Sequence, residues 1–331
     1  MLPSFTYVRA TSLGQAVREL AAPGARVHAG GTDLLGCLRD RVFGAERVVS
    51  LSALSELHGI AEQGDGTVRI GALTTLDEVA NSELIRLRYP ALAAAAAAAA
   101  SPQLRHQGTV GGNICQRPRC WYFRGDFHCA RKGGDTCFAK EGENELHAIF
   151  GGDVCVMVHP SDTAPALMAY EGSARIIGAR GSRTVPLDAF FVLPEKDYTR
   201  ETVVEAGEIV TDIVLPKPPA GGIGTYRKIR ARGAWDFALA GAAVSLGFHG
   251  KTVDRARIVL SGVAPVPWRV AAAEKELLGH ALGGSVIARA AAKASEGASP
   301  LKHNAYKVEL VRGAVTEALS TVAAAHHGAG D

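Results

Sequence analysis

The cysteines are the residues with the clearest capacity for chemistry. Five of the six, from Cys115 to Cys155, fall within 41 residues, and only Cys37 lies elsewhere. From Cys120 onward the spacing is C-x8-C-x7-C-x17-C, with no pair separated by two residues. Structural zinc sites usually contain one such short pair, so this spacing leans away from zinc. Thiolates spread this widely can surround a larger inorganic group, such as an iron–sulfur cluster.

Basic side chains outnumber acidic ones around these thiols. Residues 115–140 contain two acidic residues, Asp126 and Asp135, and six basic ones: Arg117, Arg119, Arg124, Arg131, Lys132 and Lys140. A cation near a thiol lowers the thiol pKa and offsets the negative charge of a ligated cluster. The segment also has few aliphatic residues, so we expect it to need a bound metal for its order.

Two glycine-rich segments are candidates for phosphate binding. The first, Ala29-Gly30-Gly31-Thr32-Asp33-Leu34-Leu35, joins a predicted strand to a predicted helix. The second, Gly108-Thr109-Val110-Gly111-Gly112-Asn113, follows an alanine-rich helix. Glycines let backbone N–H groups approach a phosphate, and a helix N-terminus favours negative charge. Neither segment reads GxGxxG, and each could be a plain tight turn, but together they suit a long dinucleotide.

The surrounding sequence predicts alternating strands and helices, followed by a second domain. Ser12 with Gln15 and Thr75 with Glu78 are spaced as helix capping boxes. Pro90 fits the start of the alanine-rich helix, and we expect Pro102 to end it. We predict strands at 27–29, 48–51, 68–72 and 209–215, a hairpin at 174–187, a linker at 216–222, paired strands at 242–248 and 257–263, and helices at 270–282, 285–294 and 304–324.

Bulk properties exclude several classes. The 331 residues carry a formal net charge of only +3 and no basic run with interleaved aromatic residues, so we expect no nucleic-acid partner. The apolar stretch from Ala91 to Ala100 is too short to span a bilayer. The N-terminus lacks the pattern of a signal peptide. We therefore expect a cytoplasmic chain without a membrane partner, whose cysteines are thiols or metal ligands rather than disulfides.

Further motifs resemble one known family, the FAD-binding medium subunits of xanthine dehydrogenase, carbon monoxide dehydrogenase and related molybdenum hydroxylases. The two glycine segments belong to this likeness, with Phe5-x-Tyr7, Gly207-Glu208-Ile209-Val210, Tyr226-Arg227-Lys228, Asp236-Phe237-Ala238 and Gly262-Val263-Ala264-Pro265. The resemblance implies an α+β fold: a PCMH/VAO-type FAD-binding domain at 1–218, in subdomains of about 1–57 and 58–218. A smaller α+β domain of antiparallel sheet and helices would follow at 222–331.

The same resemblance implies which residues bind FAD. Residues 26–34 would wrap the pyrophosphate, and the second glycine segment would line the flavin and its phosphates. Without the family, Asp162 would be a helix N-cap and Lys228 a solvated surface lysine. The predicted FAD contacts are Arg26, Val27, His28, Ala29, Gly30, Gly31, Thr32, Asp33, Leu34, Thr109, Gly111, Gly112, Asn113, Asp162, Val210 and Lys228.

Residues 115–156 resemble an iron–sulfur insert found in some of these subunits, those of 4-hydroxybenzoyl-CoA reductase and the bacterial periplasmic aldehyde oxidoreductase. The matching residues include Arg119-Cys120-x-Tyr122-Phe123-Arg124, Gly134-x-x-Cys137, Gly152-x-x-Cys155 and His159-Pro160-Ser161-Asp162. The likeness implies a [4Fe-4S] cluster on Cys120, Cys129, Cys137 and Cys155. We expect Cys115 and Cys37 not to be ligands, the latter as a small core residue; His128 and His147 are the alternates.

The resulting hypothesis is a relay subunit that contains FAD and a [4Fe-4S] cluster. A large molybdenum-cofactor subunit would perform the substrate chemistry, and a small subunit with two [2Fe-2S] clusters would exchange electrons with the FAD. A ferredoxin or another one-electron carrier could use the added cluster, and export to the periplasm with a partner is open. The alternatives are a stand-alone flavoenzyme of the same fold and a zinc-bound scaffold without flavin.

Overall fold

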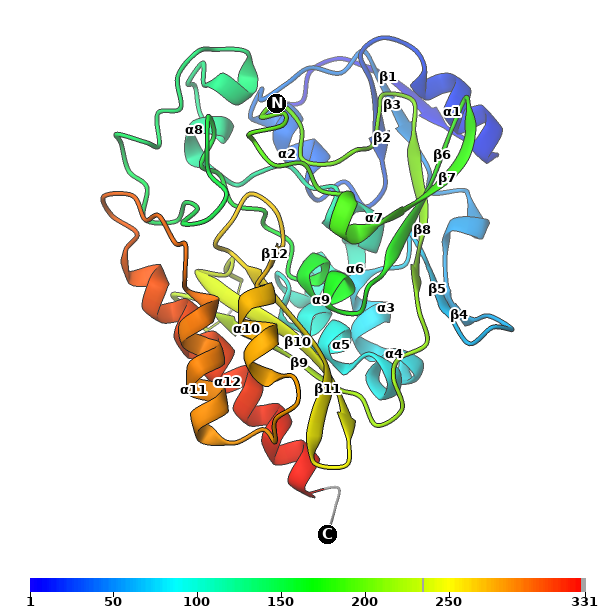
Figure 1. Ribbon diagram of the computed structural model, residues 1–331. Coiled ribbons are helices and arrows are strands. Elements are labelled where there is room, and N and C mark those ends of the chain that lie inside the picture. The colour runs from blue at the N-terminus through cyan, green and yellow to red at the C-terminus, as the bar shows by residue number, and fades with distance from the viewer. Residues whose placement is uncertain (234, 329–331) are drawn as a thin grey trace.

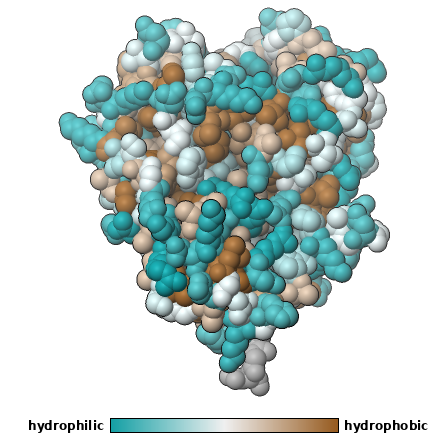
Figure 2. All heavy atoms as spheres, viewed as in Figure 1, coloured by the Kyte–Doolittle hydropathy of each residue, from teal (hydrophilic) through white to brown (hydrophobic). Residues whose placement is uncertain are grey.

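The computed structural model describes residues 1–233 and 235–328 and contains three β-sheets. The first sheet lies in an N-terminal unit, the second in the unit that follows it, and the third in a C-terminal unit (Figure 1). None of the helices in the described ranges is long and apolar enough to cross a membrane. The face in Figure 2 is largely hydrophilic, with hydrophobic residues in separate patches.

The N-terminal unit is a small parallel α/β layer, as the alternating pattern predicts. Its strands are β1 (Thr6–Arg9), β2 (Ala25–His28) and β3 (Arg47–Ser50), and β3 lies in the middle of the sheet. Helix α1 (Leu13–Leu20) begins at Ser12, whose hydroxyl accepts a hydrogen bond from the Gln15 amide. The short helix α2 (Leu34–Arg39) follows the edge strand β2. The first glycine segment therefore lies at the edge of this sheet.

The second unit surrounds a five-stranded antiparallel sheet in the order β4-β5-β8-β6-β7. The strands are β4 (Ile60–Glu62), β5 (Val68–Gly71), β6 (Ser173–Gly178), β7 (Gly181–Pro186) and β8 (Ile209–Leu215). The helices are α3 (Leu76–Asn81), α4 (Glu83–Arg88), α5 (Pro90–Ala98), α6 (Pro102–Gln107), α7 (Val110–Ile114) and α9 (Thr163–Ala169). The structure confirms three predictions in this unit: the hairpin of β6 and β7, the strand at 209–215, which is β8, and the Thr75–Glu78 capping box.

One prediction about the alanine-rich helix is wrong. Helix α5 does begin at Pro90, but it ends at Ala98, and Pro102 begins the next helix rather than ending this one. Ala100 has a φ of 48°, a left-handed conformation that turns the chain between the two helices. A proline fits the first turn of a helix because its missing N–H would have no intrahelical partner there.

The C-terminal unit is an antiparallel sheet covered by three helices. Strands β9 (Ile223–Ile229), β10 (Ala240–His249), β11 (Thr252–Ser261) and β12 (Trp268–Arg269) pair with their neighbours in sequence. Helices α10 (Ala271–Leu277), α11 (Gly284–Ala294) and α12 (Tyr306–Gly328) complete it. The β10–β11 pair and the helices are as predicted, but the sequence reading missed β9. The α+β fold class is confirmed.

The insert at 115–156 contains little regular structure: helix α8 (Trp121–Arg124) and a short 3-10 turn (Ala130–Lys132). It lies beside α2 and above the C-terminal unit in Figure 1. Three aromatic rings provide a local apolar cluster. The ring centroid of Phe127 lies 5.0 Å from that of Tyr122 and 5.3 Å from that of Phe138. The sequence reading noted the lack of aliphatic side chains and overlooked this cluster.

Candidate functional site

The two glycine segments lie against each other. A Cβ atom on Gly30 would lie 1.7 Å from the carbonyl oxygen of Gln107, directly before the second segment. Gly31 has a φ of 73°, a conformation that side chains rarely allow. The first segment therefore needs glycine at both positions, once for close backbone approach and once for its turn.

The second segment is fixed by its own contacts. The Thr109 hydroxyl accepts a hydrogen bond from the Gly112 amide at 3.2 Å and caps α7. A Cβ on Gly111 would lie 2.8 Å from that of Ala72, so this glycine is required by packing. The Asn113 carboxamide oxygen accepts hydrogen bonds from Ser161 and Thr163. Gly112 alone among the predicted residues of this segment is exposed to solvent.

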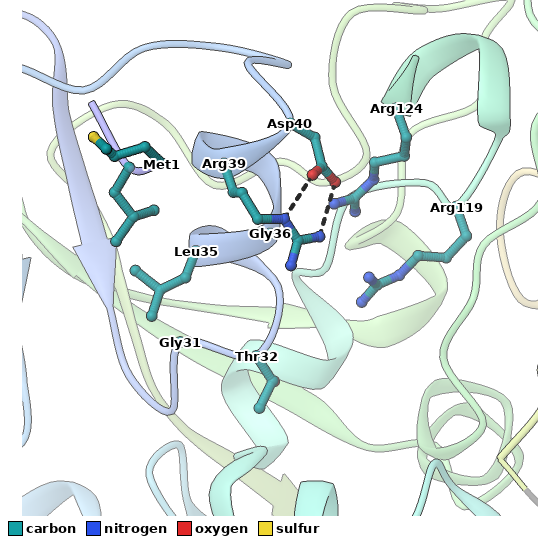
Figure 3. Close-up of a pocket in the computed structure, with 10 residues that line it drawn as sticks. Met1, Gly31, Thr32, Leu35, Gly36, Arg39, Asp40, Arg119 and Arg124 are labelled. Atoms are coloured by element: carbon teal, nitrogen blue, oxygen red, sulfur yellow. Dashed lines mark hydrogen bonds and ion pairs between the residues drawn. The ribbon is translucent and has the colours of Figure 1, made fainter.

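A cavity of about 630 Å³ opens beside the first glycine segment. Gly31 and Thr32 line one side, and the guanidinium groups of Arg119 and Arg124 line another (Figure 3). Arg39 also lines it but is paired with Asp40 on the same helix. Arg119 and Arg124 come from the insert, so the cysteine-containing segment contributes cations to the cavity beside the first glycine segment. Sequence reasoning treated these arginines only as neighbours of thiols.

The carboxylate of Asp33 joins the first glycine segment to the insert. Its Oδ1 lies 2.7 Å from the Arg124 guanidinium and 3.0 Å from that of Arg119. Its Oδ2 accepts a hydrogen bond from the Arg117 amide at 2.8 Å. Asp33 makes no side-chain cap to α2. The acid expected to wrap a pyrophosphate is thus engaged by the insert.

Asp162 and Lys228 form a buried ion pair. Their charged atoms are 2.8 Å apart, and the side chains are 6% and 4% exposed. Lys228 also donates to the carbonyl of Ala98, and the Tyr226 hydroxyl donates to Asp162 at 2.7 Å. Burial raises the pKa of Asp162, against the opposing effect of Lys228. Asp162 does occupy the N-cap position of α9, although its side chain makes no cap hydrogen bond, whereas the Lys228 side chain is buried rather than solvated at the surface.

A second cavity of about 270 Å³ lies between the insert and the C-terminal unit. Its lining is largely apolar and includes Phe237, Trp121 and Leu146, with Asp162 as a charged group. Arg119 lines both cavities and so stands between them. A mostly apolar wall with a small number of polar groups is typical of a pocket for a small molecule or cofactor.

The remaining predicted FAD contacts are dispersed around the first segment. Arg26 places its guanidinium over Phe43, and His28 lies edge-on to Tyr7. Val27 is exposed, Ala29 is half-buried, and Leu34, the first residue of α2, packs against the small apolar cluster that contains Leu38. Val210 is buried in the core of the second unit, opposite Ile176.

The four cysteines predicted as ligands line one small cavity. Cys120, Cys129, Cys137 and Cys155 surround it together with Phe123, Arg131 and Met157. Its volume of about 20 Å³ is close to that of one water molecule, so a cluster would have to push the segment apart. No group of three or more His, Cys, Asp or Glu side chains in residues 1–233 and 235–328 is arranged to hold a single metal ion.

The other cysteines and histidines occupy different surroundings. Cys115 packs against the core of the second unit, and Cys37 is fully buried beside Val42 and Phe123. His147 is buried with its Nε2 3.2 Å from the Cys120 sulfur. His128 is exposed.

The thiol of Cys155 has a lowered pKa, which favours its thiolate form. A hydrogen bond from the Cys137 thiol lowers the pKa of Cys155 to about 5, with a further contribution from Arg131. The same hydrogen bond raises the pKa of Cys137, and burial raises that of Cys120 to about 11. Four thiolates would therefore repel one another here unless a metal offset their charge. The donor set fits a thiolate-bound metal group.

Glu201 anchors the insert at a second point. This buried carboxylate lies 2.5 Å from the Arg131 guanidinium and 3.0 Å from that of Arg117. The residue follows the second unit's hairpin, 70 positions after Arg131. Together with Asp33 it holds both ends of the arginine-rich stretch. Sequence reasoning gave neither Arg131 nor Glu201 a specific role.

The comparisons agree with this arrangement. The sequence family described as the FAD binding domain in molybdopterin dehydrogenase matches residues 3–218. The chain belongs to this family. The CO dehydrogenase flavoprotein C-terminal domain matches residues 224–322. The chain is therefore an oxidoreductase subunit of the FAD-binding, medium-chain class.

Individual relatives cover most of the chain. It is 35% identical to the aldehyde oxidoreductase FAD-binding subunit PaoB of Escherichia coli (strain K12), over 83% of this chain and 86% of that protein. It is 32% identical to the carbon monoxide dehydrogenase medium chain of Hydrogenophaga pseudoflava, over 96% of each. A solved structure of carbon monoxide dehydrogenase from H. pseudoflava has a TM-score of 0.78 at 31% identity, covering 98% of this chain and 99% of that one.

Glu201→Gln should destabilise the folded protein strongly. The change leaves Arg117 and Arg131 without their shared counter-charge, and breaking a buried pair in this way costs about 3–5 kcal/mol. Urea denaturation should show the loss of unfolding free energy. Glu205→Gln is the matched control, because Glu205 pairs with Arg180 at the surface and should contribute little. Equal losses in the two variants would contradict a structural role for Glu201.

His159 should weaken the fold in acid. Burial lowers its pKa to about 4, and its neutral ring accepts from the Ser161 amide while Nε2 lies 3.3 Å from the Ile114 carbonyl. Between pH 4 and 6.5 the unfolded chain binds more protons, so stability falls as pH falls, by up to about 1.4 kcal/mol per unit. His159→Gln should flatten this dependence in urea titrations at pH 4.5, 5.5 and 6.5. Parallel profiles for the two proteins would disprove the assignment.

Proposed function

We propose that this chain is the FAD-carrying electron-transfer subunit of a molybdenum-hydroxylase-type complex and holds a [4Fe-4S] cluster on Cys120, Cys129, Cys137 and Cys155. One observation carries the proposal: a single insert lines the cavity beside the first glycine segment with arginines and a separate, smaller cavity with four cysteines. The domains would be 1–218, with subdomains of about 1–57 and 58–218 and the insert at 115–156, and 222–331.

The FAD diphosphate would bind at the first glycine segment. The backbone of residues 30–33 can donate N–H groups there, and Arg119 and Arg124 add positive charge across the cavity. Thr109, Gly111, Gly112 and Asn113 would line the flavin and its phosphates; the Thr109 cap fixes the turn of this segment, and Asn113 ties it to α9. Arg26, Val27, His28, Ala29, Leu34 and Val210 remain predicted contacts.

The flavin ring would bind near Asp162 and Lys228. Asp162 lines the largely apolar cavity between the insert and the C-terminal unit, and Lys228 is paired with Asp162. Asp162 and the Ala98 carbonyl fix the lysine ammonium in place, so its position needs no rearrangement when a ligand arrives. Bound FAD would supply the exchange of electrons singly and in pairs.

Support for the cluster comes from the grouping and chemistry of the cysteines. Their sulfurs lie around one cavity although the residues span 36 positions of irregular chain. A [4Fe-4S] cluster takes one thiolate on each of four irons, which separates the sulfurs more widely than a single ion does. Loading would open the cavity and replace the Cys137–Cys155 hydrogen bond.

The partners follow from the names of the relatives. A solved structure of carbon monoxide dehydrogenase from H. pseudoflava is described as lacking the Mo-pyranopterin moiety of the molybdenum cofactor, and the medium chain from that organism aligns along this chain. We therefore assign substrate chemistry to a large molybdenum-cofactor subunit and electron exchange to a small subunit with two [2Fe-2S] clusters. The [4Fe-4S] cluster would serve a ferredoxin or another one-electron carrier. The complex would be cytoplasmic or exported as a unit.

Gly30→Ala should weaken FAD binding at least about tenfold, which is about 1.4 kcal/mol. The new methyl group would meet the Gln107 carbonyl and force the two glycine segments apart. Flavin content per chain and reconstitution of stripped protein with FAD measure the effect. Gly44→Ala is the control, because a Cβ there meets nothing within 4 Å. Wild-type affinity in a folded Gly30→Ala protein would rule out phosphate binding at this segment.

Cys129→Ser should remove the broad visible absorption of the cluster and leave the flavin bands, since the two cavities have different walls. Iron and acid-labile sulfide should fall together. Cys115→Ser is the control and should retain both. Unchanged iron in the Cys129 variant would refute the ligand assignment, and zinc in place of iron would refute the cluster.

A further inference from the structure

Arg131 is the buried cation of the cysteine cavity. It follows Cys129 by two positions on the 3-10 turn, and its side chain is 1% exposed. Its Nε lies 3.5 Å from the Cys155 sulfur, and its Nη1 is held by Glu201. Its Nη2 is buried and has no hydrogen-bond partner within the described part of the chain. The guanidinium therefore has donor capacity left over at the cavity that the four cysteines line.

An unsatisfied buried guanidinium N–H is unfavourable, because it has lost its hydrogen bonds to water and gained none in the protein. Apart from Tyr122, whose hydroxyl already accepts a hydrogen bond from the Glu143 amide, the other side chains around the cavity offer sulfur or apolar groups: the four cysteines, Phe123, Ala130, Phe138, Ala139 and Met157. The acceptor that would satisfy this donor is therefore a negatively charged sulfur, either a thiolate or the inorganic sulfide of a cluster.

We propose that Arg131 donates a hydrogen bond to the [4Fe-4S] cluster and raises its reduction potential. The inference rests on the proposed function and goes beyond it by naming a residue that tunes the cluster. Reduction adds one electron and no proton, so the cluster becomes more negative by one charge. A buried cation and an N–H donor at sulfur stabilise the more negative form more strongly. Removing them makes reduction harder.

The charges around Arg131 make the effect local. The carboxylate of Glu201 compensates the positive charge of the Arg131 guanidinium at Nη1, and Arg117 shares that carboxylate. Asp197 also faces this group through space. The neighbouring Lys132 carries the same charge, but its ammonium donates to the Gly125 carbonyl at 2.7 Å. Lys132 is therefore a matched control for loss of one nearby positive charge without loss of a donor to sulfur.

The test is a dithionite titration of the purified holoprotein, followed by electron paramagnetic resonance of the reduced cluster. Arg131→Met should lower the ratio of reduced to oxidised cluster at fixed potential about tenfold, a shift of about 59 mV to more negative values for one electron. Arg131→Lys, which keeps the charge and loses the second donor, should fall between. Lys132→Met should match the wild type.

The outcomes separate this inference from the proposed function. Wild-type protein without iron and sulfide would defeat the proposed function and this inference with it. A cluster present in all variants, with the Arg131→Met potential equal to that of Lys132→Met, would overturn the role of Arg131 alone. If Arg131→Met fails to assemble a cluster, Arg131→Lys decides: a wild-type potential overturns the inference, and a lowered one supports it.

Discussion

The contact between Asp33 and the insert is the interaction on which the site depends. This carboxylate lies two positions after the paired glycines, and three groups of the insert converge on it from up to 91 positions away. Partly buried ion pairs of this kind are strong when an arginine donates along the carboxylate plane. Asp33 belongs to the first glycine segment, and the groups that contact it belong to the insert. Because of these contacts, neither segment can take its position independently of the other.

The small side chains of helix α5 allow the second unit and the C-terminal unit to pack closely together. Helix α5 buries Ala91, Ala95 and Ala96 and contacts both α3 and strand β9 of the C-terminal unit. Its first turn donates the Ala91 amide to Tyr170, and its last turn offers the Ala98 carbonyl to Lys228. A larger side chain on this helix would separate the Lys228 strand from the second unit, since close-packed interiors tolerate little added volume. The alanine-rich composition of α5 therefore sets the position of the buried ion pair between Asp162 and Lys228.

Local signals in the sequence predicted local structure well. The capping box at Thr75, the hairpin after Ala174 and the pairing of β10 with β11 each depend on residues close in sequence, and the structure contains all three. Strand β9 was missed because its Ile-Gly-Thr-Tyr-Arg-Lys-Ile pattern contains polar residues and a glycine beside a proline-rich linker. The turn at Ala100 carries no glycine to announce it. The long-range ion pairs were not predicted, because nothing in a single sequence links Arg131 to Glu201 or Arg124 to Asp33.

That gap changes how the positive charge of the insert is understood. In sequence, six cations against two acids suggested a field that lowers every thiol pKa. In the structure, two acids from elsewhere in the chain pair with four of these six cations: Asp33 engages Arg119 and Arg124, and Glu201 engages Arg117 and Arg131. Arg131 keeps a direct contact with sulfur, and the one lowered cysteine pKa is that of its neighbour, Cys155. Charge near a metal-binding segment thus has two separable roles. Most of it fastens the segment to the fold, and a single buried guanidinium faces the sulfurs, where the low local dielectric makes its effect largest.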